Sequence, residues 1–374
     1  MKLRGWAHAI RVPVAIVAVV VLAIRAPHIA WWLRRPRTLD VVVVDKTVPF
    51  RKWREHAGFE WLLHALKIRR PDGRYNTPPL DYIGYDPVVR TGHDITEAQL
   101  RTADVLFLAD TYGVYVGDYE QPGDIAALER SDRIYGGVTD AEANAIEGFA
   151  NRGGLLLGEF NAFASPTEDG PRATLERTFG VRWTHWVGRY WPDLQDRREV
   201  PRWIGRVYER VYGRPFDIRG AGLVLVREDA DMVVLRAGIE LGPDIVTQER
   251  TGAAPEWMPP DSAWAYWFDV VEATDADVLY EHVVHATDAG GALLARHGLR
   301  THFPALTRRR HGPRAWYFAG DFVDSGVDRG DPERAGLLWW NRTVLDARHP
   351  SLDDVFFWRW YVPVTAGILE GRVR

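Results

Sequence analysis

Short apolar runs alternate with helical patterns in the first half of this 374-residue chain, and this alternation constrains the fold most strongly. Trp53 to Ile68 carries apolar residues at helical spacing, and Thr139-Asp140-Ala141-Glu142 has the pattern of a capping box that opens a second helix. The order strand, helix, strand, strand, helix, strand predicts an α/β fold with a doubly wound, mostly parallel sheet. The predicted strands are Thr38–Val44, Asp81–Asp86, Asp104–Ala109 and Leu155–Gly158.

Residues 181–260 are less regular and are rich in Trp, Arg and Pro. We expect an irregular, β-rich insertion there, with strands at Gly222–Arg227 and Met232–Ala237. The segment from Ala276 to His297 has a helical pattern, and we expect a helix to close the insertion.

The C-terminal part returns to the sheet in this prediction. Ala315–Ala319 is expected to be its final strand, and Asp353–Leu369 a helix that packs its aromatic residues into the core. An interfacial membrane helix is the alternative for the latter. The expected organisation is an anchor (1–37), an α/β domain (38–180), a β-rich insertion with a helix (181–312), and the final strand with the C-terminal helix (313–374).

An uninterrupted apolar run, Val12 to Ile24, lies near the N-terminus between basic residues. It is shorter than the about 20 residues of a full span, but Arg25 can snorkel and the flanking segment to Trp32 can complete the crossing. We therefore expect a single-pass N-terminal transmembrane helix over residues 12–32, with the bulk of the chain extracytoplasmic at the cell membrane. A cleaved signal peptide is the alternative, although no small-x-small site follows the run.

Composition removes several classes of function. A net charge of -4 and a pI near 6.3 provide no global basic field, so we expect no nucleic-acid partner. The chain has no cysteine, which excludes disulfides, thiolate metal sites and cysteine nucleophiles.

The helix that ends in Gly-Gly, the apolar strand after it and the late AWYFAGDF segment together resemble class I glutamine amidotransferase-like domains. The resemblance covers about residues 38–180 and 313–324, and it implies a flavodoxin- or amidotransferase-like sheet. That superfamily includes many members without amidotransferase activity, some with carbohydrate-related roles. Its Gly-x-Cys-x-Gly turn corresponds here to Gly158-Glu159-Phe160-Asn161-Ala162, so Phe160 replaces the nucleophile. Glutamine hydrolysis through a thioester is therefore excluded.

Acidic residues stand at the ends of the predicted strands. Ligands of open α/β sheets bind beyond the carboxyl ends of the strands, so we expect several of these acids to share one edge. Glu159 and one of the others would then act as acid and base. A divalent cation could bind the same oxygens, although no resident cofactor or metal is expected. Capping of local backbone amides is the structural alternative. The strand-end acids are Asp45, Asp86, Asp110, Glu159 and Asp321.

Polar and aromatic residues near the same strand ends suit a sugar ligand. The rings of Tyr112 and Tyr115 could pack on a pyranose, and we expect Asn161 and Lys46 to contact the same ligand. His56, Glu60 and His64 share one helix face, but a single helix rarely closes a metal site, so an ordinary polar face is the better interpretation.

These features predict a membrane-anchored, extracytoplasmic, amidotransferase-like domain without amidotransferase activity that binds or processes a cell-envelope polysaccharide. The alternative is a non-enzymatic scaffold or accessory subunit, whose partners would be proteins of an envelope assembly or export complex. The geometry of the strand-end acids separates the two: acids facing one site favour chemistry, whereas acids held in backbone caps or Arg ion pairs favour a scaffold.

Overall fold

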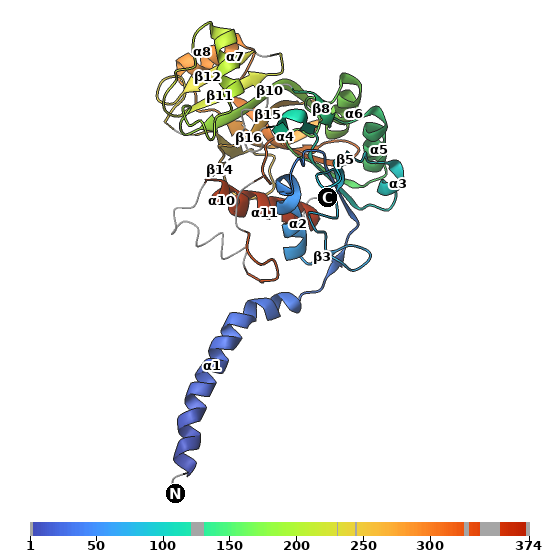
Figure 1. Cartoon of the computed structure of the whole chain (residues 1–374), viewed down its shortest axis with the longest axis vertical. Helices are drawn as coiled ribbons and strands as arrows, with labels where there is room; N and C mark the ends of the chain where they lie inside the picture. Colours follow the sequence, from blue (N-terminus) through green and yellow to red (C-terminus); the bar gives the residue numbers. More distant parts are fainter. Residues whose placement is uncertain are drawn as a thin grey trace.

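A computed structural model describes residues 3–120, 131–229, 231–243, 245–324, 329–336 and 352–371. Within these residues, ten strands form one sheet through the body, and α1 (Leu3–Trp32) projects from one end of it (Figure 1). The strands, in order across this sheet, are β14 (Ser262–Ala263), β13 (Thr247–Arg250), β16 (Ala276–Val283), β17 (His302–Arg309), β18 (Arg314–Phe318), β9 (Leu155–Gly158), β6 (Val105–Asp110), β2 (Val41–Asp45), β4 (Ile83–Asp86) and β5 (Thr91–Gly92).

The sheet is mixed rather than mostly parallel. Neighbouring strands from β18 through β9, β6 and β2 to β4 pair in parallel, as the sequence predicts for this part. On the far side of β18, the pairs β17–β18, β16–β17, β13–β16 and β13–β14 are antiparallel, and β5 pairs antiparallel with β4 at the other edge. The α/β class is therefore right, whereas the mostly parallel sheet needs correction.

The correction comes from the segment expected to be a helix over 276–297. Ala276–Val283 is instead strand β16, which pairs along its length with β17, and the helix α8 (Asp288–Arg296) begins only after Thr287. The Thr287 hydroxyl accepts a hydrogen bond from the Gly290 N–H and caps α8. Val278 and Tyr280 have side chains that favour strands. Pairing with β17 therefore outweighs the helical spacing of apolar residues in this segment.

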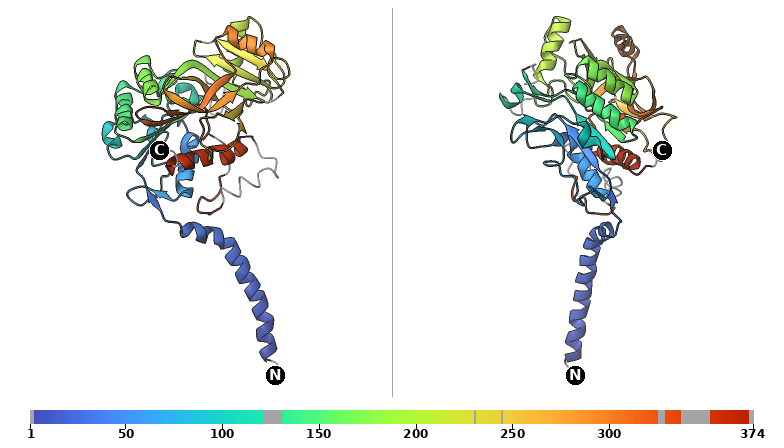
Figure 2. Two further views of the ribbon diagram at one scale, coloured as in Figure 1. Left: turned by 180° about the vertical axis from the view of Figure 1, so that it is seen from behind. Right: turned by 90° about the vertical axis from the view of Figure 1, so that its right-hand side faces the viewer.

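A second, four-stranded antiparallel sheet lies at the end of the body away from α1 (Figures 1 and 2). Its order is β12 (Met232–Arg236), β11 (Gly222–Arg227), β10 (Val181–Trp191) and β15 (Phe268–Ala273). Residues 181–312 thus supply strands to both sheets, and the predicted domain boundaries stay a prediction. Two short pairs complete the strands: β1 (Arg37–Thr38) with β3 (Ile68–Arg69), and β7 (Val114–Tyr115) with β8 (Arg133–Tyr135).

Helices cover both faces of the large sheet. Alternate residues of a strand point to opposite faces, so Phe107 packs in the core with α2 and α11 while Leu106 packs in the core with α5 and α6. This double burial explains the continuous apolar strands. The remaining helices are α2 (Arg54–Ala65), α3 (Glu97–Leu100), α4 (Val116–Glu120), α5 (Asp140–Asn151), α6 (Asp169–Phe179), α7 (Arg202–Tyr212), α10 (Leu352–Phe356), the π-helical η3 (Phe357–Tyr361) and α11 (Val362–Leu369).

Two predicted helices have the expected details. The capping box of α5 is present, since the Thr139 hydroxyl and the Glu142 carboxylate each accept a backbone N–H from the other residue. The C-terminal helix packs into the core, with Phe356 and Trp360 each 0% exposed. The core-packing prediction for this helix is therefore confirmed.

The first helix is long and apolar enough to cross a membrane over Pro13–Trp32, and a signal sequence near an N-terminus has the same properties. Its C-terminal end is bound tightly to the body. Trp31 is 4% exposed and donates its indole N–H to the Ala65 carbonyl at 3.2 Å. The Lys67 ammonium donates to the carbonyls of Trp31, Trp32 and Arg34 at 3.2, 2.5 and 2.8 Å, and so caps the helix.

The turn after β9 needs a glycine at position 158. A Cβ there would lie 2.5 Å from Cζ of Phe179, which is itself 0% exposed. We expect Gly158→Ala to lower the free energy of unfolding by about 1–3 kcal/mol through overpacking. Gly252→Ala is the matched control, because nothing lies within 4 Å of its added Cβ. Urea unfolding of both variants in detergent measures the difference, and equal stabilities would contradict this account.

Candidate functional site

The parallel strands end at one edge of the sheet, where the predicted acids lie. Asp45 and Asp110 are the last residues of β2 and β6, and Glu159 directly follows β9. Asp321 lies in the loop after β18, which pairs with β9. The pairing order β18, β9, β6, β2 therefore brings residues from four distant parts of the chain to this edge.

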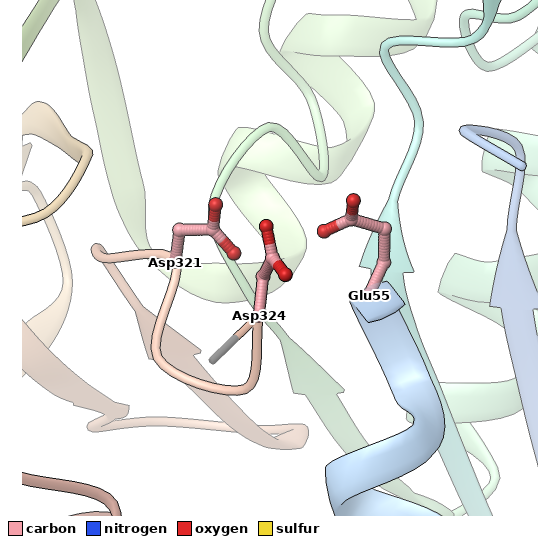
Figure 3. A group of neighbouring side chains, drawn as sticks. All are labelled: Glu55, Asp321 and Asp324. Carbon is pink, nitrogen blue, oxygen red and sulfur yellow. The ribbon is translucent and has the colours of Figure 1, made fainter. Parts of the chain in front are cut away.

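Three carboxylates meet closely at this edge. One oxygen each of Glu55, Asp321 and Asp324 lies within 4.8 Å of the others. Figure 3 shows the three carboxyl groups pointing toward one another, Glu55 from the start of α2 and the two aspartates from the loop after β18. Asp321 is half-buried, whereas Asp324 is 8% exposed and Glu55 9%. This group is the centre of the candidate site.

Glu159 and Asp110 lie beside these three acids, since the charge of each raises the pKa of Asp321. Glu159 is 1% exposed, and its Oε1 accepts a hydrogen bond from the Val323 N–H at 2.6 Å. Its Oε2 has no hydrogen-bond partner within the described part of the chain. We call Glu55, Asp110, Glu159, Asp321 and Asp324 the carboxylate cluster.

Burial sets the protonation of the carboxylate cluster. Loss of water raises the pKa of Glu55, Glu159 and Asp321 well above the ordinary value, and the neighbouring negative charges add to the rise. Burial, with the charge of Asp45, raises the pKa of Asp110 to about 7. These rises in pKa favour the protonated form of each of the four carboxyls.

Asp324 differs from its neighbours because a guanidinium lies against it. Burial raises its pKa too, but the charges of Arg54 and Arg329 oppose the rise. Arg54 Nη2 lies 2.8 Å from Asp324 Oδ2. The pKa of Asp324 is therefore raised less than that of Asp321, whose carboxyl lies beside it.

Asp45 stays outside the cluster and is held by local bonds. Its Oδ2 lies 2.6 Å from His56 Nδ1, and its Oδ1 accepts the Thr47 N–H at 2.9 Å. Burial alone would lower the pKa of His56, but the hydrogen bond and charge of Asp45 outweigh it and raise that pKa. Asp45 thus has the arrangement of a turn cap and a buried ion pair.

Lys46 is likewise bound within the protein. It is 1% exposed, and its ammonium donates to Asp94 Oδ1 at 3.0 Å, the Gly137 carbonyl at 2.8 Å and Glu142 Oε2 at 2.7 Å. An ammonium has three N–H donors, so these partners use them all. The predicted ligand contact therefore has no donor left at this position.

The other predicted ligand residues lie next to Asp110. Asn161 has a left-handed backbone (φ 62), and its N–H donates to Asp269 Oδ2 at 3.2 Å. Its side chain lies near enough to Asp110 to oppose the rise in the pKa of that carboxyl. The rings of Tyr112 and Tyr115 lie 4.9 Å apart, and both residues are half-buried. Tyr112 donates its N–H to Asp110 Oδ1 at 2.6 Å. These three residues border the carboxylate cluster on the β6 side.

Both histidines of the row on α2 have hydrogen-bond partners within the described part of the chain. His56 Nδ1 bonds Asp45 and its Nε2 lies 3.1 Å from the Pro78 carbonyl, so both ring nitrogens are engaged. His64 Nε2 lies 3.1 Å from Glu333 Oε1, and its ring stacks on Tyr75. Glu60, between the two histidines, has no hydrogen-bond partner for its carboxyl oxygens within the described residues.

Glu55 and Asp324 are cluster members that sequence reasoning missed. Glu55 lies in the first turn of the helix that follows β2, and Asp324 lies three residues after Asp321. The Asp-x-x-Asp spacing after the late strand was a usable signal. Glu55 carried a weaker one, because acidic residues in a first helical turn are ordinary partners of the helix dipole.

The cluster could hold a divalent cation by the chemistry of its donors. Carboxylate oxygens are the ligands that Ca²⁺ and Mg²⁺ prefer, and three of them lie within 4.8 Å of one another here. Arg54 contacts Asp324 from one side and supplies a positive charge to the same group. The arrangement can therefore carry a shared proton, as its raised pKa values indicate, or a cation that replaces it.

No protein-family model and no curated protein matches this sequence. Among solved structures, a ThuA-like protein from Bacteroides uniformis ATCC 8492 is 11% identical with a TM-score of 0.38, over 80% of this chain and 96% of that chain. A ThuA-like protein from Parabacteroides merdae ATCC 43184 is 10% identical with a TM-score of 0.37, over 88% and 91%. A β-galactosidase from Rahnella sp. R3 is 12% identical with a TM-score of 0.36, over 75% of this chain.

The chain spans 28% of that β-galactosidase and 30% of one from Bacillus circulans sp. alkalophilus. At these identities and TM-scores, the likenesses carry no argument about activity or substrate.

The raised pKa of Asp110 predicts how stability depends on pH. The folded pKa is about 7, above an unfolded value near 3.9, so its contribution to stability is full below about pH 4 and is lost as pH rises through 7. Asp110→Asn removes this ionisation. We expect the stability of the variant relative to the unchanged chain to increase by on the order of 2–4 kcal/mol between pH 4 and pH 8.

Urea unfolding in detergent at both pH values measures this difference. Asp86→Asn is the control, since Asp86 ends β4 outside the cluster and caps the Val88 N–H at 2.7 Å. A relative stability of Asp110→Asn that does not change with pH would contradict the raised pKa.

Proposed function

We propose that this chain is a membrane-tethered, extracytoplasmic protein that binds and hydrolyses a carbohydrate of the cell envelope at the carboxylate cluster. One observation carries the proposal: two carboxyls in unequal environments lie within 4.8 Å of each other at the carboxyl edge of the sheet. The pKa of Asp321 is raised well above the ordinary value, whereas the rise at Asp324 is opposed by the arginine that lies against it. Acid–base hydrolysis requires such a pair, with one carboxyl protonated and the other ionised.

Asp321 is the proposed general acid. Burial and the charges of Asp324, Glu159 and Asp110 raise its pKa well above the ordinary value, which favours its protonated form. Asp321 is also the least buried residue of the trio that it forms with Glu55 and Asp324. Asp324, with Arg54 against it, is the proposed base.

Glu159 has a positioning role in this proposal. It is 1% exposed and accepts the Val323 N–H, so it holds the loop between Asp321 and Asp324. Its charge also raises the pKa of Asp321. This refines the expectation from the sequence, in which Glu159 itself was the acid or the base.

The carbohydrate is supported by the residues beside the cluster. The half-buried rings of Tyr112 and Tyr115 offer apolar faces, and Asn161 offers an amide beside Asp110. Stacking surfaces next to acids and amides are the usual chemistry of sugar recognition. The N-terminal helix, long enough to span a bilayer, supports a location at the cell envelope.

The second candidate function, that of a non-enzymatic scaffold or accessory subunit, is favoured by a different observation. Asp45 and Lys46 are bound by internal partners, and Glu159 is almost completely buried. In this second function the strand-end acids only stabilise loops, and the body binds other proteins of an envelope complex.

The test uses the full chain in lipid nanodiscs and a panel of cell-envelope polysaccharides, with release of reducing ends as the readout. We expect turnover that Asp321→Asn lowers about 100-fold or more and that Asp86→Asn leaves unchanged. Adding EDTA or Ca²⁺ shows whether a cation is needed. Binding without turnover would favour the accessory function, and absence of any binding would overturn the carbohydrate ligand.

A further inference from the structure

A cavity of about 450 Å³ lies between α2 and two loops, and no member of the carboxylate cluster lines it. Glu60, Trp61 and His64 of α2 form one wall. The loop of residues 76–78 forms a second wall, and residues 329–332 form a third that includes Arg329. Its volume is within the range of small-molecule sites, roughly 300–1,000 Å³. The cavity is therefore separate from the proposed catalytic site and large enough for a small ligand.

Glu60 gives this cavity its chemistry. It is 1% exposed, and neither of its carboxyl oxygens has a hydrogen-bond partner in the described part of the chain. A buried carboxyl without partners is costly, and burial raises its pKa to about 8. Its helix neighbours His56 and His64 are both engaged elsewhere. Glu60 is thus a desolvated group that a ligand can satisfy.

The unpaired carboxyl of Glu60 favours an ammonium group over a metal or a neutral hydroxyl. A metal would need further ligands, and the histidines on either side have their own partners. A single hydroxyl would supply one hydrogen bond, whereas a primary ammonium supplies three donors and a positive charge. The ring of Trp61, also in the wall, is a favourable neighbour for such a cation.

Arg329 adds an anion-binding group to the same cavity. Its Nη2 donates to the Val323 carbonyl at 3.2 Å, and its charge also acts on Asp324. A guanidinium has five N–H donors, and their geometry matches phosphate oxygens. The cavity therefore combines a carboxyl that suits an ammonium with a guanidinium that suits a phosphate.

The cavity also lies at the end of the body to which α1 is bound. The segment that supplies Gly330 and Pro332 to the cavity wall makes two hydrogen bonds to α1. Asp331 Oδ2 lies 2.9 Å from His28 Nε2, and the Ala335 N–H donates to the Pro27 carbonyl at 3.0 Å. Figures 1 and 2 show α2 in the half of the body nearest α1. If α1 crosses a membrane, the cavity lies close to its surface.

We propose that this cavity binds a phosphoethanolamine group, with the ammonium bonded to Glu60 and the phosphate facing Arg329. The group can come from a phosphatidylethanolamine headgroup at the membrane surface or from a soluble phosphoethanolamine compound. No member of the carboxylate cluster lines this cavity, but Arg329 links the two, because its charge also acts on Asp324.

Binding is tested on the full chain in phosphatidylcholine nanodiscs, by calorimetric titration with free phosphoethanolamine. We expect saturable binding that Glu60→Gln weakens about tenfold or more through loss of the ammonium's charge partner. Ala57→Leu, which fills the cavity wall and keeps Glu60, should weaken it as well. Glu97→Gln is the control, because the Glu97 side chain is 76% exposed and lies on another helix. Thermal unfolding of each variant confirms that it is folded.

Two further ligands test whether the cavity recognises both the ammonium and the phosphate, and a lipid competition identifies the source of the group. Phosphocholine, whose quaternary nitrogen donates no hydrogen bonds, should bind more weakly, and ethanolamine should bind more weakly because it lacks the phosphate. Nanodiscs containing phosphatidylethanolamine should compete with the soluble ligand if the lipid is the source, and should not compete if a soluble compound is. Absence of saturable binding, binding unchanged in Glu60→Gln, or equal binding of ethanolamine would overturn the proposal.

Discussion

The parallel pairing of β18 with β9 is the interaction on which the candidate site depends. It joins Arg314–Tyr317 to Leu155–Gly158, although the chain between them forms all four strands of the second sheet. Because parallel neighbours end at the same edge, this pairing carries Asp321 and Asp324 to the place where β6 and β9 end. Without it, Glu55, Asp110 and Glu159 would have no acidic partners from the late part of the chain.

The same pairing explains why the site is polar and yet poorly hydrated. Helices bury both faces of the central strands, so polar side chains can gather only at the strand ends and in the loops that follow them. The loop after β18 folds back over this edge, and Glu159 holds it through the Val323 N–H. Carboxyl groups enclosed in this way lose their contact with water and repel one another when ionised. Both effects raise the pKa of Asp321.

Local sequence patterns were sufficient for the parallel half of the sheet and for its edge. The apolar runs that became β2, β6 and β9, and the Thr139 capping box, depend on spacing over a few residues. The antiparallel half could not be predicted in this way, because Ala276–Val283 becomes a strand through its partner β17, which lies further along the chain. Asp45 and Lys46 matched the strand-end pattern, but their internal partners His56 and Glu142 are set by tertiary packing.

The Lys67 cap on α1 has a mechanical consequence for a protein held at a bilayer. Lys67 gathers the carbonyls of Trp31, Trp32 and Arg34, and the Trp31 ring is enclosed by the body, so there is no slack linker between helix and domain. A flexible tether would let the domain sweep over a wide area and adopt any tilt. In the proposed membrane-tethered protein, this joint fixes the height and the facing direction of the sheet edge, and rotation of α1 turns the whole body with it.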